Sequence, residues 1–119
     1  MTSKEIILQE TIQNPLCEPE RVLLGAGGAF CCFELATRDC EILLNNIRVP
    51  EHDRGKGYAT MGIEWLKTVS ERTQDIITGI VEPNGTKGGL NTKELTEWYK
   101  KMGFEVKNGK LAYYPKSIH

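Results

Sequence analysis

The sequence has no long apolar run and no surplus of charge of either sign. No segment approaches the roughly 20 consecutive apolar residues that span a bilayer, and the N-terminal MTSKEIILQE lacks the apolar stretch of a signal peptide. Its 15 Lys and Arg are balanced by 16 Asp and Glu, whereas a nucleic-acid-binding protein needs a basic face. The 119 residues therefore predict one cytoplasmic domain, 1–119, without membrane or direct nucleic-acid binding.

Metal-binding patterns are also missing. The four cysteines, at positions 17, 31, 32 and 40, form no C-x-x-C pair, and neither histidine lies close to a group of cysteines in the sequence. A zinc site needs several such ligands at short spacing. We therefore expect no metal, and we expect the thiols to be buried or half-buried in a reducing compartment.

The N-terminal half contains short β-like segments. EIILQETI at 5–12 is compatible with a short strand, and RVLLGAGGAFCCFELAT at 21–37 predicts two strands around a glycine-rich turn. CEILLNNIRVP at 40–50 predicts a buried strand that ends at Pro50, because proline cannot continue a hydrogen-bond ladder.

The C-terminal half alternates helices and strands. Apolar residues at helical spacing predict an amphipathic helix over 58–72, and DIITGIVE at 75–82 predicts another buried strand. A second helix follows Asn91, with Gly103 just past its end. Asn108–Gly109 is a typical turn of a final hairpin. This order indicates an α/β (α+β) fold with helices packed on a mixed sheet.

The stretch HDRGKGYAT at 52–60 lies between a predicted strand and a predicted helix. The first N–H groups of a helix have no intrahelical partner, and the helix dipole adds positive charge there. A phosphate would bind well at such a site. The glycine spacing fits neither the Walker loop nor the G-x-G-x-x-G of dinucleotide-binding folds. Taken alone, the stretch is also compatible with a basic surface turn.

Two further segments make this stretch more specific. Arg54, Gly57 and Ala59 match the Arg/Gln-x-x-Gly-x-Gly/Ala loop of the GNAT superfamily of N-acyltransferases. VEPN at 81–84 is similar to the end of that family's fifth strand, and ELTEWYKKMGFE at 94–105 resembles its aromatic-Tyr-x-Lys-x-Gly-Phe helix end. The resemblance extends from about residue 40 to the C-terminus.

The resemblance implies a mostly antiparallel, twisted sheet in which the strands 41–49 and 75–82 splay apart to bind acetyl-CoA. The pantetheine arm would pair with the first of these strands, the pyrophosphate would lie on the loop and helix N-terminus, and an asparagine would contact CoA. The corresponding cofactor-binding residues are Ile47, Arg48, Val49, Arg54, Gly55, Lys56, Gly57, Tyr58, Ala59 and Asn84.

The resemblance also implies a reaction, in which an amine attacks the acetyl group directly. Tyr99 corresponds to the family's tyrosine, which protonates the leaving CoA thiolate; by itself it would be equally compatible with a packing role. The general base is less specific. Glu82 and Glu41 lie on the two strands of the expected V, and each could instead be a solvated carboxylate at a strand end.

The chain departs from the family at its N-terminus. The family places two helices between its first two strands, but residues 1–40 are too few for them, so the part that binds the acceptor is reduced and 41–119 form the CoA-binding and catalytic part. This favours an open acceptor site for an amine on a macromolecule, such as a protein lysine. The chain acts as a monomer, or a second subunit of a homodimer closes the site. The alternative function is a catalytically silent acyl-CoA-binding module that acts through a protein partner.

Overall fold

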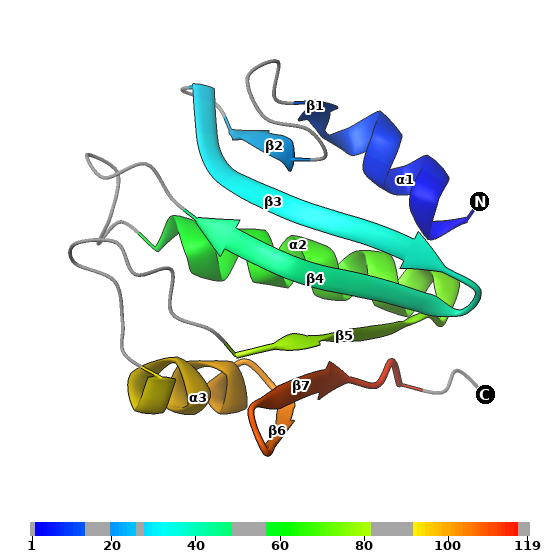
Figure 1. The fold of residues 1–119 in the computed structure, drawn as a ribbon. Helices are drawn as coiled ribbons and strands as arrows, with labels where there is room; N and C mark the ends of the chain where they lie inside the picture. Colours follow the sequence, from blue (N-terminus) through cyan, green and yellow to red (C-terminus); the bar gives the residue numbers. More distant parts are fainter. Residues whose placement is uncertain (1, 14–19, 26–27, 49–56, 82–91, 117–119) are drawn as a thin grey trace.

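One seven-stranded sheet organises the described part of the chain (Figure 1). The computed structural model describes residues 2–13, 20–25, 28–48, 57–81 and 92–116. Its helices are α1 (Ser3–Glu10), α2 (Tyr58–Thr73) and α3 (Thr92–Lys101). Its strands are β1 (Ile12–Gln13), β2 (Glu20–Gly25), β3 (Gly28–Arg38), β4 (Glu41–Arg48), β5 (Ile76–Ile80), β6 (Glu105–Lys107) and β7 (Lys110–Tyr113).

The strands lie in the order β1-β2-β3-β4-β5-β7-β6. Neighbouring strands are antiparallel except β4 and β5, which run parallel and are joined through α2. A parallel pair needs such a crossover, because the chain must return to the same end of the sheet. The expected mixed, mostly antiparallel sheet with helices packed on it is confirmed.

The core lies between the sheet and the helices. Alternate residues of the central strands, such as Phe33, Ile42 and Ile77, are fully buried on one face. That face packs against the apolar stripe of α2, whose Ile63, Leu66 and Val69 are also fully buried. We call it the helix-bearing face. The stripe repeats every three or four residues, which is why the sequence predicted this helix.

Several turn signals have the predicted effect. Asn108 and Gly109 both have positive φ, 53° and 75°, as a two-residue hairpin turn between β6 and β7 requires. The predicted pair of strands in 21–37 forms β2 and β3, which pair antiparallel up to Gly25 and Gly28.

Two expectations are wrong. The strand expected over 5–12 is absent from 5–10, because residues 3–10 form α1, which Thr2 and Glu5 start with a reciprocal capping box; only Ile12 belongs to a strand, the two-residue β1. Ile6 and Ile7 are buried in the core, so packing and capping outweigh their β-branched preference. The thiol of Cys40 is exposed rather than buried, because Cys40 lies in the tight turn between β3 and β4 with φ of 61°.

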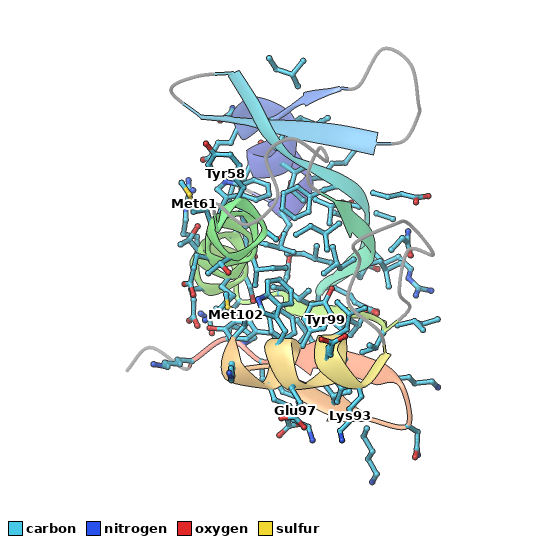
Figure 2. All side chains as sticks on the ribbon, turned by 90° about the vertical axis from the view of Figure 1, so that its left-hand side faces the viewer. Tyr58, Met61, Lys93, Glu97, Tyr99 and Met102 are labelled. Carbon is cyan, nitrogen blue, oxygen red and sulfur yellow. The ribbon has the colours of Figure 1, made fainter. Side chains whose placement is uncertain are left out.

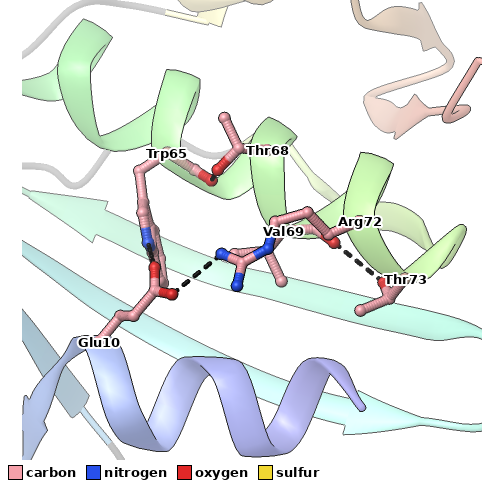
Figure 3. A network of polar contacts seen from close by, with 6 residues as sticks. All are labelled: Glu10, Trp65, Thr68, Val69, Arg72 and Thr73. Atoms are coloured by element: carbon pink, nitrogen blue, oxygen red, sulfur yellow. Dashed lines mark hydrogen bonds and ion pairs between the residues drawn. The ribbon is translucent and has the colours of Figure 1, made fainter. Parts of the chain in front are cut away.

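Polar contacts fasten α1 to α2. Glu10 accepts hydrogen bonds from the indole of Trp65 at 2.8 Å and from Arg72 at 2.9 Å (Figure 3). At the other end of α1, the buried Ser3 hydrogen bonds to Asp75 and to Thr73. The short N-terminal part is therefore held at both ends of its helix.

In the part of the chain that the structure describes, no helix combines the length and the apolar character needed to cross a bilayer.

The contacts of Glu10 predict a pH-dependent stability. Hydrogen bonds from Trp65 and then Arg72 hold the pKa of Glu10 below its usual 4.5. A lowered pKa stabilises the fold at pH values above 4.5, and this contribution disappears as the pH falls through the folded-state pKa. We expect Glu10→Gln to lower the free energy of unfolding at pH 7 by up to about 1 kcal/mol. The difference from wild type should vanish near pH 3 in urea titrations.

The control is Glu97→Gln, which removes an exposed carboxylate on α3. It should follow the wild-type curve at every pH. If the loss of unfolding free energy in Glu10→Gln stays constant down to pH 3, the loss comes from packing and not from the charge of this carboxylate.

Candidate active site

The parallel strands β4 and β5 pair over only part of their length. Their register runs from Glu41–Ile76 to Leu44–Gly79, which is four pairs, while β4 continues to Arg48. Beyond Leu44, β4 remains paired with β3 on its other side. Figure 1 shows the two strands diverging toward the end at which α2 begins. This arrangement matches the expected splay of the strands.

A β-bulge marks the point of divergence. Glu34 of β3 lies opposite Asn46, whereas the next residue, Leu35, lies opposite Leu44, so Asn45 is an extra residue in β4. A bulge bends its strand and increases the local twist. Here it occurs directly after the last residue of β4 that pairs with β5, and it turns β4 away from that strand.

Gly79 fixes how closely the strands approach before they part. A Cβ at this position would lie only 2.5 Å from the carbonyl oxygen of Leu44. Any side chain would therefore push β5 away from β4 at their last pair. The sequence analysis did not identify Gly79; its signal was a glycine within an otherwise β-branched strand, which often marks a close backbone approach.

Gly57 starts α2 in the left-handed conformation, with φ of 79°. No side chain caps this helix end, and no acidic residue lies in its first turn. A Cβ at Gly57 would meet no atom within 4 Å, so the space beside its backbone is open. The helix dipole thus leaves partial positive charge at an exposed glycine, which is the arrangement that binds anions.

The other predicted cofactor-binding residues divide into those that the structure describes and those that lie outside this description. Ile47 and Tyr58 are half-buried and pack against the core, and Ala59 lies in the first turn of α2. Ile47 and Arg48 belong to the segment of β4 beyond its pairing with β5. The remaining predictions, Val49, Arg54, Gly55, Lys56 and Asn84, lie outside the described residues, as do Glu82 and Asn91.

The end of α3 holds Tyr99 in place. The N–H of Phe104 donates to the carbonyl of Tyr99 at 3.0 Å, and the N–H of Gly103 donates to that of Lys100 at 3.1 Å. With Gly103 at φ of 94°, these bonds form a Schellman motif. The rings of Tyr99 and Phe104 pack edge-on, 5.5 Å apart. Tyr99 is 6% exposed and points toward the sheet, whereas Lys93 and Glu97 point away from it (Figure 2).

Glu41 lies at the closed end of the strand pair, opposite Ile76. Its carboxylate accepts a hydrogen bond from Thr78 and lies 3.9 Å from Arg38. The divergence begins four residues further along β4, which is about 13 Å at the usual rise of a strand. These contacts engage the Glu41 carboxylate at the closed end of the strand pair.

Metal binding has no support among the described residues, where no three His, Cys, Asp or Glu side chains form a possible ligand group. Both histidines lie in segments outside this description. The absence of a metal therefore stays a prediction.

No protein-family model and no curated protein sequence matches this chain. Solved structures do match. The anti-CRISPR protein AcrVA5 gives a TM-score of 0.61 at 17% identity, over 79% of this chain and 97% of that one. The ribosomal-protein-S18-alanine N-acetyltransferase from Escherichia coli gives 0.61 at 14% identity, over 98% and 88%.

An aminoglycoside 6′-N-acetyltransferase, solved in complex with coenzyme A, gives a TM-score of 0.58 at 14% identity, over 97% of this chain and 79% of that one. Identities this low establish a common fold and not a common substrate. The matched structures, the parted strands and the exposed helix N-terminus beside them lead to one conclusion: this chain has the fold of the GNAT acetyltransferases.

Proposed function

We propose that this protein is an N-acetyltransferase that moves an acetyl group from acetyl-CoA to an amine. The observation that carries the proposal is the end of the β4–β5 pairing at the bulge, next to the uncapped N-terminus of α2. Several proteins with this fold are acetyltransferases, and three of them were solved with coenzyme A. The fold and the local geometry thus support the same activity.

The donor would lie between the parted strands. Its diphosphate would accept hydrogen bonds from the backbone N–H groups of Arg54 to Ala59, that is, from the loop before α2 and the first residues of this helix, where the helix dipole favours negative charge. Its pantetheine arm, which contains amide groups, would follow β4 near Ile47, Arg48 and Val49, and Asn84 would contact it as well. The left-handed Gly57 supports this part of the proposal, because a glycine lets a phosphate approach the backbone closely.

The reaction is a direct transfer. The amine nitrogen attacks the thioester carbonyl, a C–N bond forms, and the C–S bond breaks as CoA leaves. Tyr99 donates its phenolic proton to the departing thiolate. A carboxylate accepts the proton that the ammonium must lose. Glu82 is the first candidate; Glu41 is the second, and its contacts with Arg38 and Thr78 at the closed end of the strands favour Glu82.

The acceptor that we propose is an amine on a macromolecule, such as a protein lysine, because residues 14–19 alone connect β1 to β2, a segment too short for the two helices that the family places between its first strands. A monomer would leave this side open, and a homodimer would close it with a second subunit. The decisive experiment incubates the protein with acetyl-CoA and lysine-containing proteins, and measures free thiol together with the mass of the acceptor. Binding of acetyl-CoA without thiol release would instead support the silent CoA-binding module.

Substitution of Gly57 tests the diphosphate site. We expect Gly57→Glu to weaken CoA binding about 100-fold or more, because a carboxylate would stand where the diphosphate binds. Isothermal titration calorimetry with CoA measures the loss. The matched control is Gly109→Glu, since Gly109 also has positive φ, 75°, and open space around its Cα. If both variants bind CoA equally well, the start of α2 does not hold the diphosphate.

Substitution of Tyr99 tests the proton donor. We expect Tyr99→Phe to lower turnover by roughly 100-fold or more, with CoA affinity nearly unchanged, because only the departing thiolate needs the phenolic proton. Steady-state rates and calorimetry separate the two effects.

Tyr113→Phe is the matched control for this tyrosine. Tyr113 is equally buried, and burial, followed by its hydrogen bond to Glu71, raises its pKa to about 12. It contacts Phe104, as Tyr99 does. This variant should keep wild-type turnover once its stability is taken into account. Equal rates for Tyr99→Phe and wild type would remove Tyr99 from the mechanism.

A further inference from the structure

The two faces of the sheet are unlike each other. All three described helices contribute their buried residues to the core on the helix-bearing face. The opposite face carries Glu34, Ala36, Leu43, Thr78 and Ala112, which lie side by side on β3, β4, β5 and β7 by register. We call it the open face, because no described helix packs on it (Figure 2). Each of these residues is half-buried rather than buried.

Among the described residues, Glu34 is the carboxylate of the open face that lies closest to the divergence. It stands on β3 opposite Asn46, directly beside the bulged Asn45. Its chain neighbours Phe33 and Leu35 are buried on the helix-bearing face, so its own side chain leaves the sheet on the open face. No hydrogen bond or ion pair joins its carboxylate to another of the described residues. Glu41, on the same face, is already engaged by Arg38 and Thr78.

The location of α2 indicates which face of the sheet would bind the donor and which would receive the acceptor. The helix packs on the helix-bearing face, so a donor whose diphosphate binds at its start occupies that side of the parted strands. A nucleophile needs a path to the thioester that the donor does not fill. The open face is the other side of the parted strands, and Glu34 lies on it one strand away from β4, at a spacing of roughly 5 Å.

We propose that Glu34 binds the ammonium group of the acceptor on the open face, and so selects a primary alkylammonium. This inference rests on the proposed function. An ammonium would form a charge-assisted hydrogen bond with the half-buried carboxylate, while Ala36 and Leu43 beside it contact the methylene chain. Glu34 holds the cation as it approaches, and the proton then passes to the general base. Both a lysine side chain and a free polyamine present this chemistry.

The test measures amine binding directly, so it does not depend on turnover. A lysine-containing peptide with a blocked N-terminus, and spermidine in a second arm, are titrated into the protein saturated with CoA. We expect Glu34→Gln to raise about tenfold the dissociation constant of whichever amine binds to wild type. A change of this size corresponds to the loss of one charge-assisted hydrogen bond. Glu34→Asp should recover part of the loss. Tighter binding of the peptide than of spermidine identifies a lysine as the source.

The matched control is Glu105→Gln, because Glu105 lies on the same face by register but on the edge strand β6. It should bind amines as wild type does. In turnover assays with acetyl-CoA, Glu34→Gln should raise the KM for the amine with little change in CoA affinity. Added salt should weaken amine binding to wild type more than to this variant, since the screened ion pair is absent there.

Equal amine affinity of wild type and Glu34→Gln, or no amine binding by wild type in either arm, overturns the proposal for Glu34. Neither result bears on the donor site, which calorimetry with CoA tests. Conversely, absence of thiol release with every amine would overturn the proposed transfer reaction, while a tenfold loss of amine binding in Glu34→Gln would still stand.

Discussion

The structure depends on where the parallel pairing of β4 and β5 stops. Four register pairs hold the strands together, and Gly79 brings their backbones close at the last of them. The extra residue Asn45 then bends β4 away while β3 continues to support it. Because α2 connects the two strands, its N-terminus lies at the end where they part. The unpaired edge of β4, the N-terminus of α2 and the left-handed Gly57 therefore lie together at the end where the ladder stops.

A sheet interrupted in this way needs support elsewhere. The long β3 provides it on one side, and the β5–β7 pairing provides it on the other. The N-terminal helix adds to this support, because Glu10 is bound to Trp65 and Arg72, and Trp65 packs on Phe33 with ring centres 5.6 Å apart. Phe33 in turn lies opposite Ile47, within the parted segment of β4. A short N-terminal part can thus stabilise the strand along which we propose the donor binds.

Local signals explain most of what could be predicted. Gly103 and Phe104 predict a helix end, and their backbone bonds hold Tyr99 through a Schellman motif. Asn108–Gly109 predicts its turn, and the spacing of Ile63, Leu66 and Val69 predicts α2. The prediction failed for residues 5–12, since a capping box and burial in the core outweigh the β-branched residues there. The assignment of Tyr99, Glu82 and Glu41 to catalysis stays a prediction.

The sequence by itself determined α2, α3 and the turn at Asn108–Gly109, the mixed fold and the resemblance of its glycine-rich loop to an acyl-CoA site, because each depends on neighbours within a few positions. The tertiary structure alone decided the bulge at Asn45, the close approach at Gly79 and the separation of the sheet into a helix-bearing and an open face. These features depend on the register between paired strands and on which face of the sheet the helices cover, and no local pattern encodes either. The same register distinguishes Glu34, beside the divergence, from Glu41 at the closed end.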